Sequence, residues 1–280
     1  NDQSKILGLT NNKLKMALNR KHTVLLDFKG SLLIALFGAV FFANTSFAGG
    51  HEESESSPHE WSANMAILSE YSFRGITQSN EDPAIQVGID YAHETGFYVG
   101  FWASSVEFND GPNATQLETN FYTGYGGSVG SLDYDLGFLY YYYPEEDADE
   151  PGSGLGEQDL WEVYGSLGTA FDTAGEPSVT VGFAYSPDYY GSDGDSIYIY
   201  GDFGFSLGPI SPYATVAYLD VEGDKTTPAG YDYVHYVIGA STDIGQFTLD
   251  LYWSDKQEGT DHGGSGSGHD GVIFGISSSW

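Results

Sequence analysis

The sequence predicts an all-β chain that closes into a twelve-stranded antiparallel transmembrane β-barrel of the outer-membrane type. Three observations predict this: segments that alternate between large apolar and small or polar side chains, an even number of such segments, and connections that are alternately long and short. Alternation with a period of two gives a strand two unlike faces. In a bacterial barrel the apolar face meets lipid and the polar face meets a lumen. A soluble sandwich would explain single amphipathic strands but not the alternating connection lengths.

The alternating segments have the length that a membrane requires. A tilted strand of about ten residues crosses the roughly 25 Å apolar height of an outer membrane. The last segment is the clearest, because its large apolar residues share one face and end on an aromatic residue: Val272, Phe274, Ile276 and Trp280. The expected strands are 62–73, 84–92, 97–108, 115–126, 132–143, 159–170, 178–186, 195–206, 211–221, 231–242, 246–256 and 271–280.

The connections fall into two classes that alternate along the chain. Outer-membrane barrels have long extracellular loops and short periplasmic turns. The segments expected outside are 74–83, 109–114, 144–158, 187–194, 222–230 and 257–270. The short turns expected on the periplasmic side are 93–96, 126–131, 172–177, 208–210 and 243–245.

The faces of most strands sort by polarity. In 246–256, for example, Leu249 and Leu251 lie on one face and Asp250 on the other, so the charged side chain faces away from lipid. Segment 211–221 cannot be oriented in this way, because Tyr213 and Tyr218 lie on opposite faces.

The first 48 residues predict an export signal. Basic residues precede the apolar run 32–43, and Ser46-Phe47-Ala48 gives a small-x-small exit before Gly49. The run is too short for a comfortable membrane helix, so a cleaved signal peptide is the favoured interpretation. Residues 1–48 are therefore expected to be upstream sequence and signal peptide, 49–60 a disordered acidic leader, and 61–280 the barrel, exported to a bacterial outer membrane where lipid and lipopolysaccharide surround it.

Charge and cysteine content narrow the function. The formal net charge is −31, and removal of residues 1–48 would leave three basic and 38 acidic residues, a net charge of −35. Polyanions are bound through Lys and Arg, so nucleic acid is excluded as a partner. The chain has no cysteine and hence no disulfide framework.

Residues 62–106 resemble the opening of the TorF family of porins. The shared pattern comprises Ser62-Ala63-Asn64, Tyr71-Ser72-Phe73-Arg74-Gly75, Asp82-Pro83-Ala84-Ile85-Gln86 and Gly96-Phe97-Tyr98. Residues 132–144 are similar to the family's middle portion. The resemblance implies an outer-membrane barrel with pore activity, and it does not carry a substrate.

The predicted lumen is acidic. Its expected residues are Glu70, Arg74, Glu118, Asp133, Asp135, Glu162, Asp202 and Asp250. Rings of Asp and Glu favour cations in a narrow aqueous path. The predicted function is a porin-like channel for passive passage of small solutes or ions that prefers cations. The alternative is a non-conducting barrel with a structural or surface role, whose acidity is solvated surface and whose lumen is plugged by tyrosines. Arg74 either constricts the mouth or ties down the first loop.

Enzymatic and metal-dependent functions have weaker support. His235 is expected to be a lumen-facing spacer with no serine beside it on that face, so no hydrolase and no enzyme is predicted. Oxygen-rich loops could bind calcium. The weak candidates are Asp261, His262, His269 and Asp270. Mobile acidic loops explain them as well, and no other cofactor is expected. Oligomeric state is not predicted.

Overall fold

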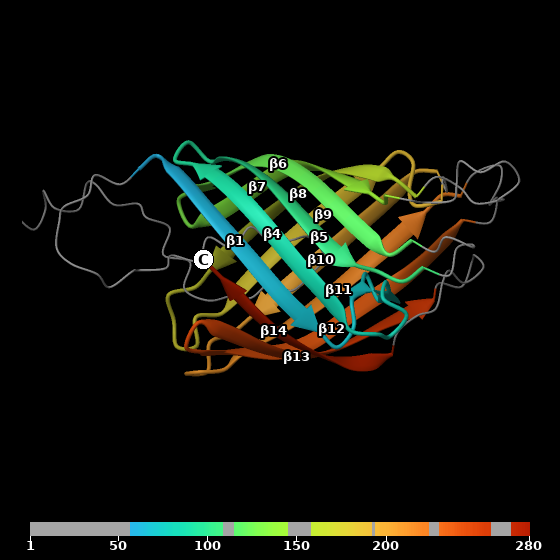
Figure 1. The fold of residues 1–280 in the computed structure, drawn as a ribbon. Coiled ribbons are helices and arrows are strands. Elements are labelled where there is room, and N and C mark those ends of the chain that lie inside the picture. Colours follow the sequence, from blue (N-terminus) through green and yellow to red (C-terminus); the bar gives the residue numbers. More distant parts are fainter. Residues whose placement is uncertain (1–56, 109–114, 145–157, 192–193, 224–229, 259–269) are drawn as a thin grey trace, which may run out of the picture.

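The chain is a closed antiparallel barrel of twelve strands, as the sequence predicts. The computed structural model describes residues 57–108, 115–144, 158–191, 194–223, 230–258 and 270–280. Its barrel strands are β1 (His59–Leu68), β4 (Ala84–His93), β5 (Phe97–Ser105), β6 (Leu117–Val129), β7 (Leu132–Tyr142), β8 (Leu160–Ala170), β9 (Ser178–Ser186), β10 (Ser196–Gly204), β11 (Ser211–Val221), β12 (Tyr231–Ile244), β13 (Phe247–Glu258) and β14 (Gly271–Ser279). Figure 1 shows the strands crossing the barrel obliquely. The predicted signal peptide and most of the leader lie outside the described residues and stay a prediction.

The barrel closes between its first and last strands. β1 pairs with β4 on one side and with β14 on the other, and Asn64 lies opposite Ser279. Ala63 and Trp280 exchange both backbone hydrogen bonds, at 3.0 and 2.9 Å. No barrel strand therefore keeps a free edge, which lipid would leave without hydrogen-bond partners.

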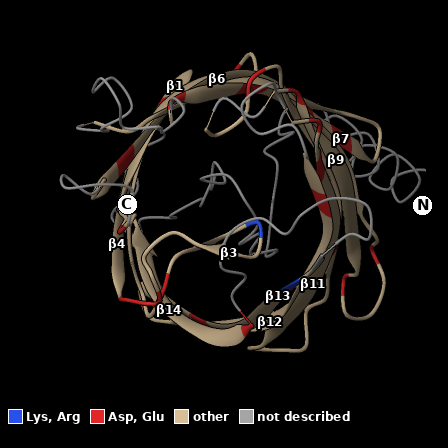
Figure 2. Cartoon of the chain, turned by 90° about the vertical axis from the view of Figure 1, so that its right-hand side faces the viewer, with Lys and Arg blue, Asp and Glu red and all other residues tan. Residues whose placement is uncertain are grey.

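The first connection departs from the sequence prediction. A strand over 62–73 followed by an outer loop over 74–83 was expected, but β1 ends at Leu68. The chain then forms a separate hairpin of two short strands, β2 (Ser72–Phe73) and β3 (Ile76–Thr77). Figure 2 shows β3 inside the ring of barrel strands. The alternation of side chains continues through Phe73, so the sequence pattern could not mark the point where the chain leaves the wall.

The exterior is apolar along its length. Large hydrophobic side chains are exposed on the outward face of every barrel strand, for example Ile89, Phe121, Leu136, Ile199 and Phe274. In β11, which the sequence pattern did not orient, Val216 and Tyr218 face outward, and Tyr213 and Thr215 face inward. A band of this kind is the surface that a membrane-spanning barrel presents to lipid. Within the described ranges, no helix has both the length and the apolar character needed to cross a membrane.

A charge at mid-height on this face should be costly. Leu251 lies near the middle of β13 and is 54% exposed. We expect Leu251→Arg to lower the free energy of unfolding in lipid vesicles by about 2–4 kcal/mol. Val129 ends β6 at a short turn and is 71% exposed. The control Val129→Arg should cost only about 0–1 kcal/mol, because it lies at the interface. Equal, small effects in urea unfolding would contradict a lipid-facing exterior.

Candidate functional site

The β2–β3 hairpin turns on Arg74 and Gly75. Both residues have positive φ, 52° and 78°, as the two central residues of a two-residue hairpin turn of this hand require. Gly75 also allows a close approach, because a Cβ there would lie 3.0 Å from both His235 and Lys256. A non-glycine residue in this region costs roughly 1 kcal/mol or more. The contacts of the Arg74 side chain hold it in place.

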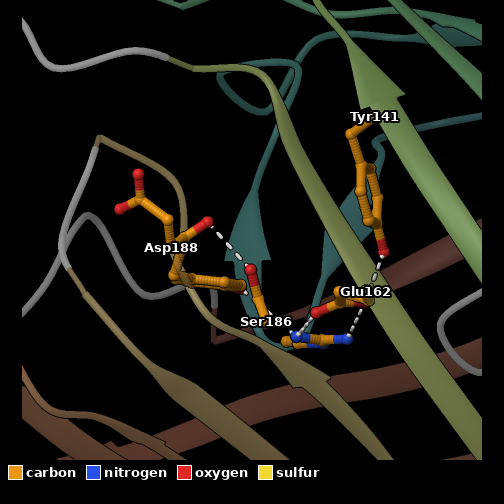
Figure 3. A network of polar contacts seen from close by, with 6 residues as sticks. Tyr141, Glu162, Ser186 and Asp188 are labelled. Atoms are coloured by element: carbon orange, nitrogen blue, oxygen red, sulfur yellow. Dashed lines mark hydrogen bonds and ion pairs between the residues drawn. The ribbon is translucent and has the colours of Figure 1, made fainter.

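Arg74 forms a buried ion pair with Glu162 on β8. Its Nη1 and Nη2 donate to the two carboxylate oxygens at 2.8 and 2.9 Å, and both side chains are fully buried. Tyr141 also donates to Glu162 at 3.0 Å (Figure 3). The guanidinium lies over the ring of Tyr198 at 4.4 Å. Burial alone would lower the pKa of Arg74, but Glu162, Tyr189 and Tyr141 together outweigh it and hold that pKa well above its ordinary value.

The hairpin reaches across the lumen to several walls. Tyr71 donates to Glu118 on β6 at 3.4 Å, and its ring packs against Trp102 on β5. Phe73 packs edge-on against Tyr141 on β7, with ring centroids 5.9 Å apart. The Ser72 hydroxyl lies 3.4 Å from that of Ser254 on β13. The long-connection half of the barrel is therefore crossed by a segment held on at least five strands.

The connection after β9 joins this cluster. Tyr189 is buried, and its hydroxyl accepts a hydrogen bond from Arg74 at 3.4 Å. Just before it in the chain, the Ser186 hydroxyl donates to the Asp188 carbonyl at 2.8 Å (Figure 3). Burial raises the pKa of Tyr189, so its hydroxyl stays protonated.

The short-turn half of the interior has a different construction. Tyrosine rings lie flat over glycines of the neighbouring strand, where any Cβ would overlap the ring. Three of these tyrosines pass over the glycine and reach an aspartate on the strand beyond it. The three sets are Tyr98–Gly124–Asp135, Tyr122–Gly100–Asp90 and Tyr213–Gly239–Asp250. Tyr164 over Gly137 and Tyr200 over Gly182 repeat the stacking. The rings thus line the wall instead of projecting to the axis.

The predicted lumen residues occupy these two halves. Glu70, Glu118 and Glu162 are buried with Arg74 in the long-connection half, the half that the hairpin crosses. Asp135, Asp202 and Asp250 lie inward in the short-turn half, and the Oδ1 of Asp202 accepts from Thr215 at 2.6 Å. Asp133 lies at the rim instead, where it accepts from Ser128 across the turn at 2.5 Å. Arg74 was expected at the end of the first strand, but it lies at the tip of the β2–β3 hairpin. The role of these residues in selectivity stays a prediction.

Sequence reasoning missed the inward residues Asp90 and Lys256 and the contact between His235 and Ser254. Asp90 is buried on β4, and the alternation of Val87, Ile89 and Tyr91 with it would have placed it inside. The expectation that no serine lies beside His235 was wrong. Ser254 on β13 approaches its Nε2 at 3.2 Å, because the register sets it diagonally across from His235. The other ring nitrogen faces the Tyr198 hydroxyl at 3.3 Å.

The calcium candidates gain no support. Asp261, His262 and His269 lie outside the described residues. Asp270 accepts a hydrogen bond from the Trp253 indole at 2.9 Å, a structural contact near the barrel end. Among the residues that the structure places, no three His, Asp or Glu side chains gather as a metal site would need.

Comparison with known proteins places the chain in a family. A family model described as Gcw_chp, a bacterial protein of unknown function, matches residues 52–278. No curated protein matches the sequence. Similar solved structures include an outer membrane channel from Pseudomonas putida F1, with 11% identity, a TM-score of 0.45 and coverage of 82% of this chain and 98% of that chain. LpxR from Salmonella typhimurium has 10% identity, a TM-score of 0.43 and coverage of 78% and 99%. These likenesses concern the barrel fold alone.

Removing the charge of Glu162 should free the hairpin. Breaking one side of a buried ion pair costs about 3–5 kcal/mol, because it leaves an uncompensated buried charge. We expect Glu162→Gln to expose the Arg74–Gly75 bond to trypsin in the folded barrel, while the wild type resists cleavage there. The control Asp202→Asn changes an inward carboxylate remote from the hairpin and should resist like the wild type. Equal cleavage of the wild type and Glu162→Gln, seen by mass spectrometry, would show that the ion pair does not hold the hairpin.

The flat tyrosines make their glycines sensitive to substitution. Gly100→Ala places a methyl group against the Tyr122 ring, which Asp90 anchors, and overpacking of this kind costs about 1–3 kcal/mol. At Gly201, on the outward face, a Cβ would meet nothing closer than 3.8 Å. Gly201→Ala should change the free energy of unfolding by no more than about 0.5 kcal/mol. If both alanine variants unfold in urea like the wild type, the stacking is not structural.

Proposed function

The chain belongs to the Gcw_chp family of bacterial proteins of unknown function, and from its closed acidic barrel we propose that it is an outer-membrane, porin-like channel. It lets small solutes pass passively and prefers cations. Closed single-chain barrels with an even strand number, an apolar exterior and a polar interior belong to bacterial outer membranes. The predicted signal peptide and the resemblance of residues 62–106 to TorF porins support the same proposal.

The proposed cation preference follows from the negative charge of the barrel interior. Seven carboxylates face inward in the described residues: Glu70, Asp90, Glu118, Asp135, Glu162, Asp202 and Asp250. Two basic side chains face inward in the same part of the chain, Arg74 and Lys256, and Arg74 is engaged by Glu162. The field inside a low-dielectric wall concentrates counter-ions of the opposite sign. The local concentration of cations is therefore raised in this lumen, and that of anions is lowered.

The hairpin supports a second candidate, a barrel that does not conduct. It crosses the lumen from β1 to Glu162 on β8, and its side chains contact walls on either side. A segment held in this way narrows or closes the long-connection half. In that case the protein is a structural or surface barrel, and release of the hairpin would open it.

The Ser254–His235 contact does not favour an enzyme. A nucleophilic serine needs a histidine oriented by a third group, commonly a carboxylate. Here the third group is the Tyr198 hydroxyl, and Ser254, His235 and Tyr198 are all buried beneath the hairpin. We assign this contact to packing of the hairpin against β12 and β13.

Planar-bilayer recording tests the channel. We expect purified wild type to give discrete conductance steps and, in a salt gradient, a reversal potential of the sign for cation selectivity. The preference should grow from 1 M to 0.01 M salt, because the Debye length rises from about 3 to 30 Å. Anion preference would contradict the acidic lumen. A silent wild type with a conducting Glu162→Gln would favour the closed barrel, and silence of both folded proteins would contradict the channel.

A further inference from the structure

Four inward aspartates are spaced evenly around the barrel. They lie on β4, β7, β10 and β13, which are every third strand in the closed order of twelve. The four are Asp90, Asp135, Asp202 and Asp250. Each lies two or three residues from the short-turn end of its strand.

These aspartates also share one level. The strand registers, with a tilt of about 40°, place their Cα atoms within roughly 5 Å of a common height. Twelve strands at this tilt give a barrel radius of about 12 Å. Neighbouring carboxylates are then roughly 13 Å apart, and each is about 10 Å from the axis. At about 0.1 M salt this distance is close to the Debye length, so an ion on the axis is attracted by all four carboxylates.

The side chains that bind these aspartates lie along the wall and fix the carboxylates. The tyrosines that bind Asp90, Asp135 and Asp250 lie flat on glycines, so their rings do not occupy the axis. A hydroxyl donates to each of the four aspartates, from Tyr122, Tyr98, Thr215 and Tyr213 respectively. Hydroxyls orient a carboxylate without neutralising it.

No base neutralises this level in the described residues. Arg74 pairs with Glu162, and Lys256 lies near the long-connection end of β13, over the Tyr233 ring. The Oδ2 of Asp202 is buried and has no hydrogen-bond partner among the placed side chains. A buried carboxylate oxygen without a partner is costly unless water or a cation satisfies it. Asp202 therefore has a carboxylate oxygen that can accept water or a cation inside the barrel.

We propose that Asp90, Asp135, Asp202 and Asp250 form the ring that selects cations, at the mouth on the short-turn side. The proposal rests on the proposed channel function and narrows its selectivity to one level of the lumen. Glu162 contributes less, because Arg74 pairs with it.

The test compares two fourfold variants that remove the same charge from the same end of the barrel. The ring variant carries Asp90→Asn, Asp135→Asn, Asp202→Asn and Asp250→Asn. The control carries Glu94→Gln, Asp172→Asn, Glu176→Gln and Asp243→Asn, all exposed; the first three lie on short turns and Asp243 lies at the short-turn end of β12. Asparagine keeps an oxygen that accepts the tyrosine or threonine hydroxyl. Folding is checked by circular dichroism and by resistance to SDS before heating.

In a tenfold gradient of dilute KCl, the ring variant should conduct and lose the cation preference, with a permeability ratio lower by roughly tenfold. The control should keep the wild-type ratio. A ring variant that conducts with the wild-type ratio would overturn the ring and leave the channel standing, as would a control that loses as much. A silent wild type would overturn both.

Two double variants keep the test decisive if the fourfold ring variant fails to fold. Asp90→Asn with Asp202→Asn, and Asp135→Asn with Asp250→Asn, each remove an opposite pair. Each should lose part of the preference, and by similar factors. Unchanged ratios in both would overturn the ring.

Discussion

Closure of the sheet between β1 and β14 is the constraint on which the rest depends. Lipid offers no partner for a backbone N–H or C=O, so a sheet that meets lipid must have no free edge. The bonds between Ala63 and Trp280 meet that requirement. Once the ring is closed, every inward residue shares one enclosed space and every outward residue meets one surface. The alternating faces of twelve separate strands thereby become one apolar exterior and one polar interior.

The interior divides according to how its charges are compensated. In the half near the long connections, the hairpin brings Arg74 to Glu162, and the tyrosines around them complete a packed, nearly neutral layer. In the half near the short turns, hydroxyls hold the aspartates and no base accompanies them in the described chain. Flat stacking on glycine lets large rings line that wall without filling it. One half is thus crossed by the hairpin, and the other keeps its negative charge.

Sequence alone placed all twelve barrel strands, because a period of two is a local property that each strand shows by itself. It also placed Asp135, Asp202 and Asp250 inward, for the same reason. It failed where contacts depend on register. The approach of Ser254 to His235 follows from how β12 and β13 align, which no single strand reveals. The hairpin was missed because its side chains continue the alternation, and only tertiary contacts draw it off the wall.

Alternate residues of one strand face water and lipid, and thiol labelling can test this arrangement residue by residue. The chain has no cysteine, so single cysteines can be placed in turn at positions 248, 249, 250, 251 and 253 of β13. In lipid vesicles, a water-soluble cationic thiol reagent should modify cysteines at 248 and 250 and spare those at 249, 251 and 253. Uniform reaction along the strand, or the opposite alternation, would contradict a barrel with one face in lipid and one in water.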